Sequence, residues 1–164
     1  MMGKNIDRRA LLGLGVIAGS SLLLLGRTSG ASAMAFAINR SPDQWRRQLG
    51  PDRFRILREA GTETPFTSPL LKEHRRGTFV CAGCSLPLFS SATKFESGTG
   101  WPSFWKALPG GVATHTDRSL LMERTEVLCH RCGGHLGHVF DDGPKPTGLR
   151  YCMNGYAMKL EKQA

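Results

Sequence analysis

The spacing of the cysteines restricts the fold of this chain more than any other feature. The sequence contains five cysteines, and four of them form two CxxC pairs, Cys81/Cys84 and Cys129/Cys132. Two such pairs supply the four thiolates of a closed tetrahedral site, which favours one structural zinc ion per chain. The ion would tie together two turns that lie far apart in the sequence. Two disulfides, a redox-active CxxC pair and an iron site are the alternatives.

The fifth cysteine, Cys152, has no partner in this scheme and is a candidate nucleophile. It lies between Arg150 and Asn154, and in a β-strand all three side chains would point to the same side. Arg150 would then favour the thiolate, and Asn154 could hydrogen-bond at the reacting centre. The alternative is an inert cysteine buried in a strand.

Two further segments carry side chains suited to a reactive site. His135 and His138 lie three residues apart in a glycine-rich run after the second CxxC pair. Imidazoles near a thiolate could bind a polarised oxygen or carry a proton. Trp101 belongs to an aromatic cluster on a glycine-containing loop and could contact a methyl group beside a sulfur atom. The alternatives for the two histidines are a second metal site or a purely structural role. The alternative for Trp101 is ordinary core packing.

The first 35 residues have the pattern of an export signal. Adjacent Arg8 and Arg9 precede an apolar run, and small residues follow that run. The arginine pair is the twin-arginine feature of bacterial export. We therefore expect residues 1–35 to be a twin-arginine-type export signal and the protein to be periplasmic. An uncleaved anchor is the alternative, and only in that case would the membrane be a partner.

The charge of the chain does not favour a nucleic-acid partner. The formal net charge is +9, but the basic residues are scattered. The sequence shows no repeat of basic and aromatic residues that would stack bases. A composition with 40% hydrophobic and 21% charged residues is typical of a globular protein with a solvated basic surface.

The remainder of the chain divides into a linker at residues 36–40 and one domain at residues 41–164. The segment Ser41-Pro42-Asp43-Gln44 has the pattern of a capping box and predicts a helix that ends at Gly50. Pro51 then begins a second short helix. Two short N-terminal helices are therefore expected.

The rest of the domain is rich in β-forming segments separated by turns. These segments predict strands at residues 77–81, 112–116, 120–123, 126–129, 149–156 and 157–160. No alternation of strands and helices indicates a parallel sheet. The expected fold is a small, mainly β body of antiparallel sheets, with two helices and a zinc staple.

Several ordered motifs resemble those of the B-type peptide-methionine (R)-S-oxide reductases. The resemblance covers about residues 41–160, nearly all of the chain after the expected signal. The matching stretches are Gly61 to Phe66, Gly77 to Cys81, Lys94-Phe95 with Ser97 to Phe104, His135 to Pro144, and Gly148 to Asn154.

The resemblance implies a fold of coiled, Mss4-like antiparallel sheets and a reductase domain at residues 41–164. The substrate would be methionine (R)-sulfoxide, chiefly in oxidised proteins or peptides, so the activity would repair oxidised proteins. Cys152 would attack the sulfoxide sulfur and become a sulfenic acid. A thioredoxin-like or other thiol reductant would then restore the thiol.

The resemblance also implies the roles of the other candidate residues. Trp101 matches the aromatic side chain of the methyl pocket. The arginine beside the nucleophile matches Arg150. The family's residues that line the site and interact with the sulfoxide oxygen match His135, His138 and Asn154. The zinc ligands match Cys81, Cys84, Cys129 and Cys132.

One position departs from the family pattern. Many members carry a resolving cysteine where this chain has Thr99. We therefore expect an external thiol to reduce the sulfenic acid directly, or a metal-site cysteine to be recruited transiently. A zinc-stapled binding module and a disulfide exchanger that uses a CxxC pair are the rival functions.

Overall fold

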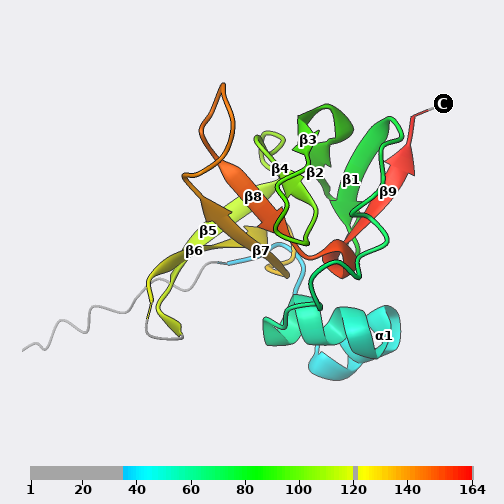
Figure 1. Cartoon of the computed structure of the whole chain (residues 1–164). Coiled ribbons are helices and arrows are strands. Elements are labelled where there is room, and N and C mark those ends of the chain that lie inside the picture. Colours follow the sequence, from blue (N-terminus) through cyan, green and yellow to red (C-terminus); the bar gives the residue numbers. More distant parts are fainter. Residues whose placement is uncertain (1–34, 120–121, 164) are drawn as a thin grey trace, which may run out of the picture. The chain divides into compact units, whose positions relative to one another are not determined.

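Two antiparallel β-sheets and one α-helical element form the part of the chain that the computed structural model describes, residues 35–119 and 122–163 (Figure 1). Except for its last residue, the expected export segment at residues 1–35 lies outside these described residues. Within them, no helix has both the length and the apolar character needed to cross a bilayer. The prediction of a mainly β body with antiparallel sheets is confirmed.

The smaller sheet contains three strands in the order β2-β1-β9. Their bounds are Gly77–Cys81 for β1, Pro87–Ser90 for β2 and Met158–Lys162 for β9. The central strand β1 pairs antiparallel with both neighbours. The last strand of the chain is therefore hydrogen-bonded to the first, which fixes the C-terminal segment in the sheet.

The larger sheet contains six strands in the order β3-β4-β8-β7-β6-β5. Their bounds are Lys94–Phe95 for β3, Ser103–Phe104 for β4, Val112–Asp117 for β5, Arg124–Cys129 for β6, His135–Phe140 for β7 and Arg150–Met153 for β8. In this register Cys152 lies between Ser103 of β4 and His138 of β7. The candidate nucleophile thus lies in the interior of a sheet.

Two of the expected strands differ from the structure. The strand expected at residues 149–156 ends at Met153, and a 3₁₀ turn over Gly155–Ala157 follows it. The strand expected at residues 120–123 is not formed at Met122 and Glu123, which lie in the connection before β6, and residues 120–121 lie outside the described part. Asn154 is therefore at the start of a turn and no longer in the strand of Cys152.

The helical element α1 spans Pro42–Glu59. The expected capping box is present, because the Ser41 hydroxyl accepts from the Gln44 backbone N–H and the Gln44 side chain accepts from the Ser41 N–H. Gly50, with φ 70° and ψ 174°, interrupts the helical backbone at the expected break. The two short helices of the prediction are thus one element with a kink, since Pro51 continues the helix directly after Gly50.

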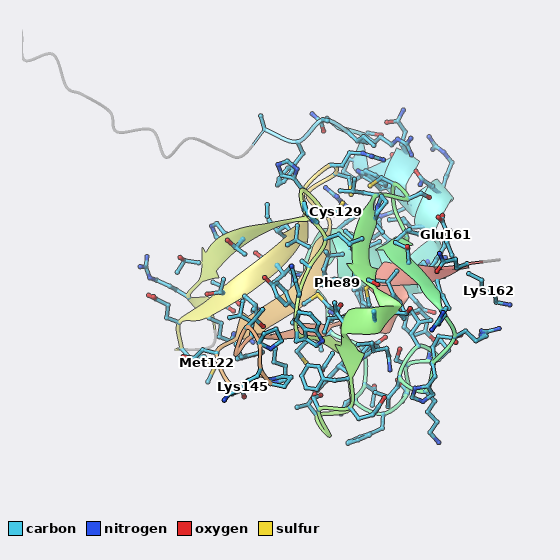
Figure 2. All side chains as sticks on the ribbon, turned by 90° about the horizontal axis from the view of Figure 1, so that it is seen from above. Phe89, Met122, Cys129, Lys145, Glu161 and Lys162 are labelled. Atoms are coloured by element: carbon cyan, nitrogen blue, oxygen red, sulfur yellow. The ribbon has the colours of Figure 1, made fainter. Side chains whose placement is uncertain are left out.

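The core lies between the two sheets and α1. Phe104 stacks on Phe89 with ring centroids 4.4 Å apart and meets the edge of Phe79 at 4.9 Å, and all three rings are fully buried. Figure 2 shows Phe89 in the interior of the described body, with Met122 and Lys162 at its periphery. Because these rings come from β1, β2 and β4, they join the two sheets.

Truncation of Phe104 to alanine is expected to lower the free energy of unfolding by about 3–5 kcal/mol, because it removes a ring that contacts two others in the core. Urea denaturation followed by circular dichroism measures the change. Phe66 is 68% exposed, so Phe66→Ala is the matched control and should change the value by less than about 0.5 kcal/mol. A loss for Phe104→Ala as small as that of the control would contradict this packing.

Candidate active site and metal centre

The structure separates the five cysteines into a cluster of four and a single residue. The Sγ atoms of Cys81, Cys84, Cys129 and Cys132 all lie within 4.8 Å of one another, and none of the five cysteines forms a disulfide. Within the cluster, Cys81 and Cys132 are 3.8 Å apart and Cys84 and Cys129 are 3.5 Å apart. Tetrahedral ligands with metal–sulfur bonds of about 2.3 Å would lie about 3.8 Å apart. The four side chains therefore fit one thiolate-bound ion.

The two CxxC turns have the same backbone hydrogen bonds. Cys81 N–H donates to the Leu86 carbonyl at 2.9 Å, and Cys129 N–H donates to the Gly134 carbonyl at 2.8 Å. In each turn the residue after the second cysteine has a positive φ, 55° at Ser85 and 65° at Gly133. Each turn therefore presents its two sulfurs to the same side, as the sequence pattern predicted.

The helical element α1 packs directly on these turns. The Gln48 side chain donates to the Gly83 carbonyl at 2.6 Å, and the Arg58 guanidinium donates to the Cys132 carbonyl at 2.8 Å. Trp45 is buried, and Arg58 lies over its ring at 4.8 Å. Loss of the cluster would thus also weaken the attachment of α1, whose apolar side chains remain in the core.

Electrostatics in the cluster favour a bound cation. Hydrogen bonding with Cys129 and the other neighbouring sulfurs, together with burial, raises the pKa of Cys81. Hydrogen bonding with Cys129 similarly raises the pKa of Cys132. Four sulfurs this close cannot all ionise without a compensating positive charge, and a divalent cation supplies it.

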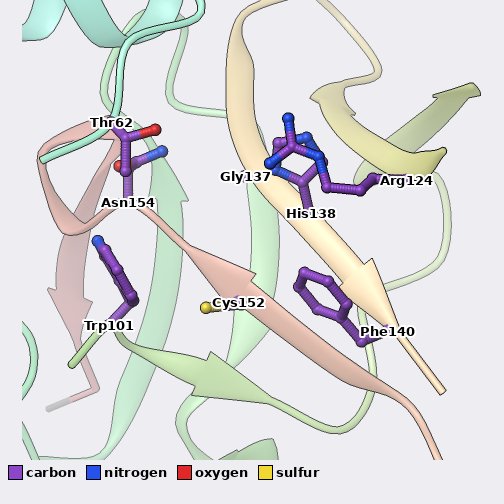
Figure 3. Close-up of a pocket in the computed structure, with 8 residues that line it drawn as sticks. All are labelled: Thr62, Trp101, Arg124, Gly137, His138, Phe140, Cys152 and Asn154. Carbon is purple, nitrogen blue, oxygen red and sulfur yellow. The ribbon is translucent and has the colours of Figure 1, made fainter. Parts of the chain in front are cut away.

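Cys152 lies outside this cluster, in a pocket of about 140 Å³ (Figure 3). Figure 3 shows its sulfur between Trp101 on one side and Phe140 on the other. The lining residues are Thr62, Trp101, Arg124, Gly137, His138, Phe140, Cys152 and Asn154. Cys152 is half-buried. The pocket has a predominantly apolar wall and a few polar groups, as small-molecule sites do.

Asn154 and Trp101 are held in place by a residue that sequence reasoning missed, Glu63. The Trp101 indole N–H donates to the Glu63 carbonyl at 3.1 Å, and the Glu63 N–H donates to the Asn154 Oδ1 at 2.9 Å. The Glu63 carboxylate accepts from the backbone N–H groups of Gly155 and Tyr156 at 2.6 and 3.1 Å. Burial raises the pKa of Glu63, and these two hydrogen bonds oppose the rise. Its location in the matching motif Gly61 to Phe66 was the signal available in the sequence.

A β-bulge brings the two histidines together. Residues three apart in a regular strand point to opposite faces, but the register between β6 and β7 shifts by one extra residue at Leu136. The rings of His135 and His138 consequently lie 5.5 Å apart. His138 lines the pocket and His135 does not. The predicted pair is therefore one pocket residue and one supporting residue.

His135 is buried and bonded to a carboxylate. Its Nδ1 lies 2.6 Å from the Glu126 Oε1. This contact lowers the pKa of Glu126, although partial burial opposes the shift. The His135 ring thus has a fixed orientation behind the pocket.

His138 belongs to a second group of polar side chains, with Asp117 and Arg124. Its Nε2 lies 2.8 Å from the Asp117 Oδ2, and the Arg124 Nη2 donates to the same oxygen at 2.6 Å. Burial lowers the pKa of His138, the nearby Arg124 charge lowers it further, and the Asp117 contact opposes both. His138 is therefore mainly uncharged at neutral pH.

Arg124 was not among the predicted site residues, although it lines the pocket. Within the described residues, its Nε is a buried side-chain nitrogen without a hydrogen-bond partner. A buried donor of this kind normally has a partner. Arg124 therefore combines a position at the pocket with a buried Nε–H that has no partner among the described residues.

Arg150 makes a contact with Asp142 that was not predicted, and it also lies near the Cys152 sulfur, as predicted. Its guanidinium binds Asp142 through two hydrogen bonds of 2.8 Å and lies 4.3 Å from the centre of the Phe140 ring. The Asp142 contact raises the pKa of Arg150, and the nearby Cys152 sulfur adds to the rise. Arg150 is close to Cys152 but does not line the pocket.

Gly137 is required by the close approach of β7 and β8. Its φ is 153°, and a Cβ at this position would lie 2.1 Å from the Cys152 carbonyl oxygen. Any side chain would therefore displace the strand that carries the candidate nucleophile. The glycine between the two histidines has this steric cause.

Comparison with known proteins identifies a family for most of the chain. Residues 49–162 match the SelR domain. "Peptide methionine sulfoxide reductase MsrB" of Leptospira interrogans serogroup Icterohaemorrhagiae serovar Lai is 53% identical over 131 residues, 79% of this chain and 100% of the relative. The protein of the same name from Agrobacterium fabrum is 54% identical over 125 residues, 76% of this chain and 93% of the relative. The protein of this name from Methanosarcina mazei is 49% identical over 127 residues, which are 77% of this chain and 91% of the relative.

Removal of a bound metal is expected to lower the melting temperature by more than about 10 °C, because the four crowded sulfurs lose the cation that holds the two turns and α1 together. Differential scanning calorimetry before and after chelation measures the change, and reloading the metal is the control. An unchanged melting temperature in metal-free protein would contradict a structural role for the cluster.

Proposed function

This chain belongs to the SelR-domain family of MsrB peptide methionine sulfoxide reductases, and from this membership we propose how its residues perform the reaction. The protein is a peptide-methionine (R)-S-oxide reductase, an oxidoreductase that reduces methionine (R)-sulfoxide. The observation that carries the proposal is the location of Cys152, apart from the four-cysteine cluster and open to a small apolar pocket.

Cys152 is the nucleophile in this proposal. Its sulfur attacks the sulfoxide sulfur, so the oxygen passes to Cys152 and the substrate leaves as methionine. One thiol and one sulfoxide thereby give one sulfenic acid and one thioether: the cysteine sulfur loses two electrons and the substrate sulfur gains them. The chemistry needs a reactive sulfur and a proton on the departing oxygen.

His138 and Arg124 are the proposed partners of that oxygen. His138 lines the pocket and is mainly uncharged, so it can pass a proton from solvent to the oxygen without holding a permanent charge there. Arg124 also lines the pocket, and its guanidinium places a positive charge near that oxygen. Asp117 holds both side chains in place.

Trp101 is the proposed contact for the methyl group of the substrate. Its indole N–H is fixed to the Glu63 carbonyl, so the ring keeps one orientation beside Cys152. Aromatic rings make favourable contacts with sulfur and its methyl groups. A rigid wall on one side of the nucleophile would allow one sulfoxide epimer to present its sulfur correctly. Asn154 supports this wall through Glu63.

We propose that an external thiol, such as a thioredoxin-like protein, regenerates Cys152. The other four cysteines of the chain are in the cluster, and Thr99 occupies the position of the family's usual resolving cysteine. Two thiols of the reductant would convert the sulfenic acid to a thiol, with one water and one disulfide as products. Oxidised proteins are the proposed physiological substrates.

Zinc is the proposed ion of the four-cysteine cluster. Four thiolates in a closed tetrahedral arrangement are typical of structural zinc, which needs no open coordination position. Cys81, Cys84, Cys129 and Cys132 would hold it. The ion would support the fold and take no part in the reduction.

Export to the periplasm through the twin-arginine route remains our proposal for the location. It depends on the sequence of residues 1–35, with Arg8-Arg9 before an apolar run, and on residues 36–40 as a linker to the reductase domain at 41–164. Cell fractionation of wild type and an Arg8→Lys, Arg9→Lys variant tests it. Equal amounts of both in the periplasm would contradict the proposed route.

The wild-type protein is expected to reduce the R epimer of a methionine sulfoxide peptide and not the S epimer. Cys152→Ser should lose activity by at least about a thousandfold, because a hydroxyl cannot replace the nucleophilic sulfur. Chiral chromatography of the peptide product measures both results, and zinc content is the control for folding. Full activity of Cys152→Ser would exclude Cys152 as the nucleophile.

His138→Gln is expected to lower the rate of the first turnover by about a hundredfold or more, because it removes the side chain that passes a proton from solvent to the sulfoxide oxygen. Rapid quench of a single turnover, with excess enzyme over sulfoxide peptide, measures this step without the reductant. His74 is exposed and lies outside the pocket, so His74→Gln is the matched control. Equal rates for the two variants would argue against proton transfer through His138.

Mass spectrometry of protein oxidised by substrate, in the absence of reductant, is expected to show a sulfenic acid at Cys152, trapped by dimedone, and no intramolecular disulfide. The reason is that the other four sulfurs are held in the metal cluster. A disulfide between Cys152 and a cluster cysteine would overturn direct reduction by an external thiol.

A further inference from the structure

A chain of hydroxyl groups runs from the Cys152 sulfur into the loop between β3 and β4. The Thr99 Oγ1 lies 3.6 Å from the Cys152 Sγ, within hydrogen-bond distance for sulfur. The Ser97 Oγ lies 2.8 Å from the Thr99 Oγ1 and 2.7 Å from the Ser103 Oγ. The Ser103 hydroxyl then donates to the Trp101 carbonyl at 3.1 Å. The chain thus begins at the nucleophile and ends at a carbonyl, which can only accept.

Counting protons gives this chain a direction. Each hydroxyl carries one proton, and that of Ser103 is used by the Trp101 carbonyl. Ser97 must therefore donate to Ser103, and Thr99 must donate to Ser97. With all three hydroxyl protons assigned, the Cys152 thiol is the group that donates to Thr99 in the resting enzyme.

Ionisation of Cys152 requires one change in this order. A thiolate cannot donate, so the Thr99 hydroxyl can turn its proton toward the sulfur. Ser97 then loses that donor but still accepts from the Thr99 backbone N–H, at 3.4 Å. Rotation of the Thr99 hydroxyl alone therefore gives the Cys152 sulfur a hydrogen bond both as a thiol and as a thiolate.

The backbone fixes the loop at the nucleophile. Ser103 pairs with Cys152 across β4 and β8, and its side chain is fully buried. Gly100 has a φ of 94°, and a Cβ there would lie 2.7 Å from Pro65, so the loop packs closely against the neighbouring segment. The Phe66 N–H also donates to the Gly100 carbonyl at 2.8 Å. Thr99 consequently has a defined position next to the sulfur.

We propose that the Thr99 hydroxyl is a catalytic hydrogen-bond partner of the Cys152 sulfur, which accepts from the thiol and donates to the thiolate and to the sulfenic acid. This inference rests on the proposed role of Cys152 as nucleophile. Arg150 on β8, the strand of Cys152, and His138, its pairing partner on β7, are charged or titratable side chains near this sulfur. Thr99 differs from them because its hydroxyl is neutral. This hydroxyl accepts from the sulfur when the sulfur carries a proton and donates to the sulfur when it does not.

The same hydroxyl acts in both halves of the cycle. In the first half it stabilises the sulfur that attacks the sulfoxide. In the second half it holds the sulfenic acid, while an external thiol attacks the Cys152 sulfur and the hydroxyl of the sulfenic acid leaves as water. A second thiol then releases Cys152 and forms the disulfide of the reductant. Thr99 itself is neither oxidised nor reduced.

Thr99→Val tests the proposal, because valine keeps the β-branched shape and lacks the hydroxyl. At pH 7, alkylation of Cys152 by iodoacetamide, followed by peptide mass spectrometry, should slow by about tenfold, and so should the first turnover with the sulfoxide peptide. Thr99→Ser should restore both rates to within about threefold of wild type. Thr114 is exposed on β5, so Thr114→Val is the matched control and should leave both rates unchanged.

A third substitution tests the geometry independently. In Thr99→Cys, the sulfenic acid at Cys152 should condense with the new thiol at position 99, with loss of water, and the oxidised protein should contain that disulfide. Wild-type rates in Thr99→Val, a Thr99→Ser variant as slow as Thr99→Val, or no disulfide in oxidised Thr99→Cys would each overturn the proposal. The alkylation assay uses no sulfoxide, so it distinguishes failure of this proposal from failure of the proposed reaction.

Discussion

The contact of four sulfurs is the constraint on which the rest of this structure depends. Cys81 ends β1 of the smaller sheet, and Cys129 ends β6 of the larger one, so the cluster joins the two sheets at their ends. The helical element α1 binds to the backbone of the same turns through Gln48 and Arg58. A single ion at this junction would add a cross-link between the sheets to the apolar core that already joins them.

The reactive pocket depends on a different set of contacts, which are mostly backbone interactions. Gly137 allows β7 to approach β8 at Cys152, and His138 lies on the same face as Cys152 because the two residues pair across these strands. On the opposite wall, buried Glu63 holds Trp101 and Asn154. Because each polar group in this wall is hydrogen-bonded to backbone, the pocket keeps its shape without a bound molecule.

Particular residues show where sequence reasoning succeeded and where it failed. The CxxC turns and the break at Gly50 were predictable because they depend on local spacing and on glycine geometry. Cys152 and Asn154 both line the pocket, as predicted, but the strand ends at Met153, so Asn154 reaches the pocket from the start of a turn. Glu63 was missed because its partners lie about 90 residues along the chain, and Arg124 was missed because only the pairing of β5 with β6 places it beside Asp117.

The sequence by itself determined the separation of the sulfur atoms into two pairs and one single cysteine, the antiparallel class of the fold and the family, because these follow from residue spacing and strand-forming segments. Only the tertiary structure decided which polar side chains reach the pocket. It directs Arg150 to Asp142, His135 to Glu126, and the Thr99 hydroxyl to Cys152. The physical reason is that hydrogen-bond partners are chosen by strand register, bulges and loop packing, which bring together residues distant in the chain.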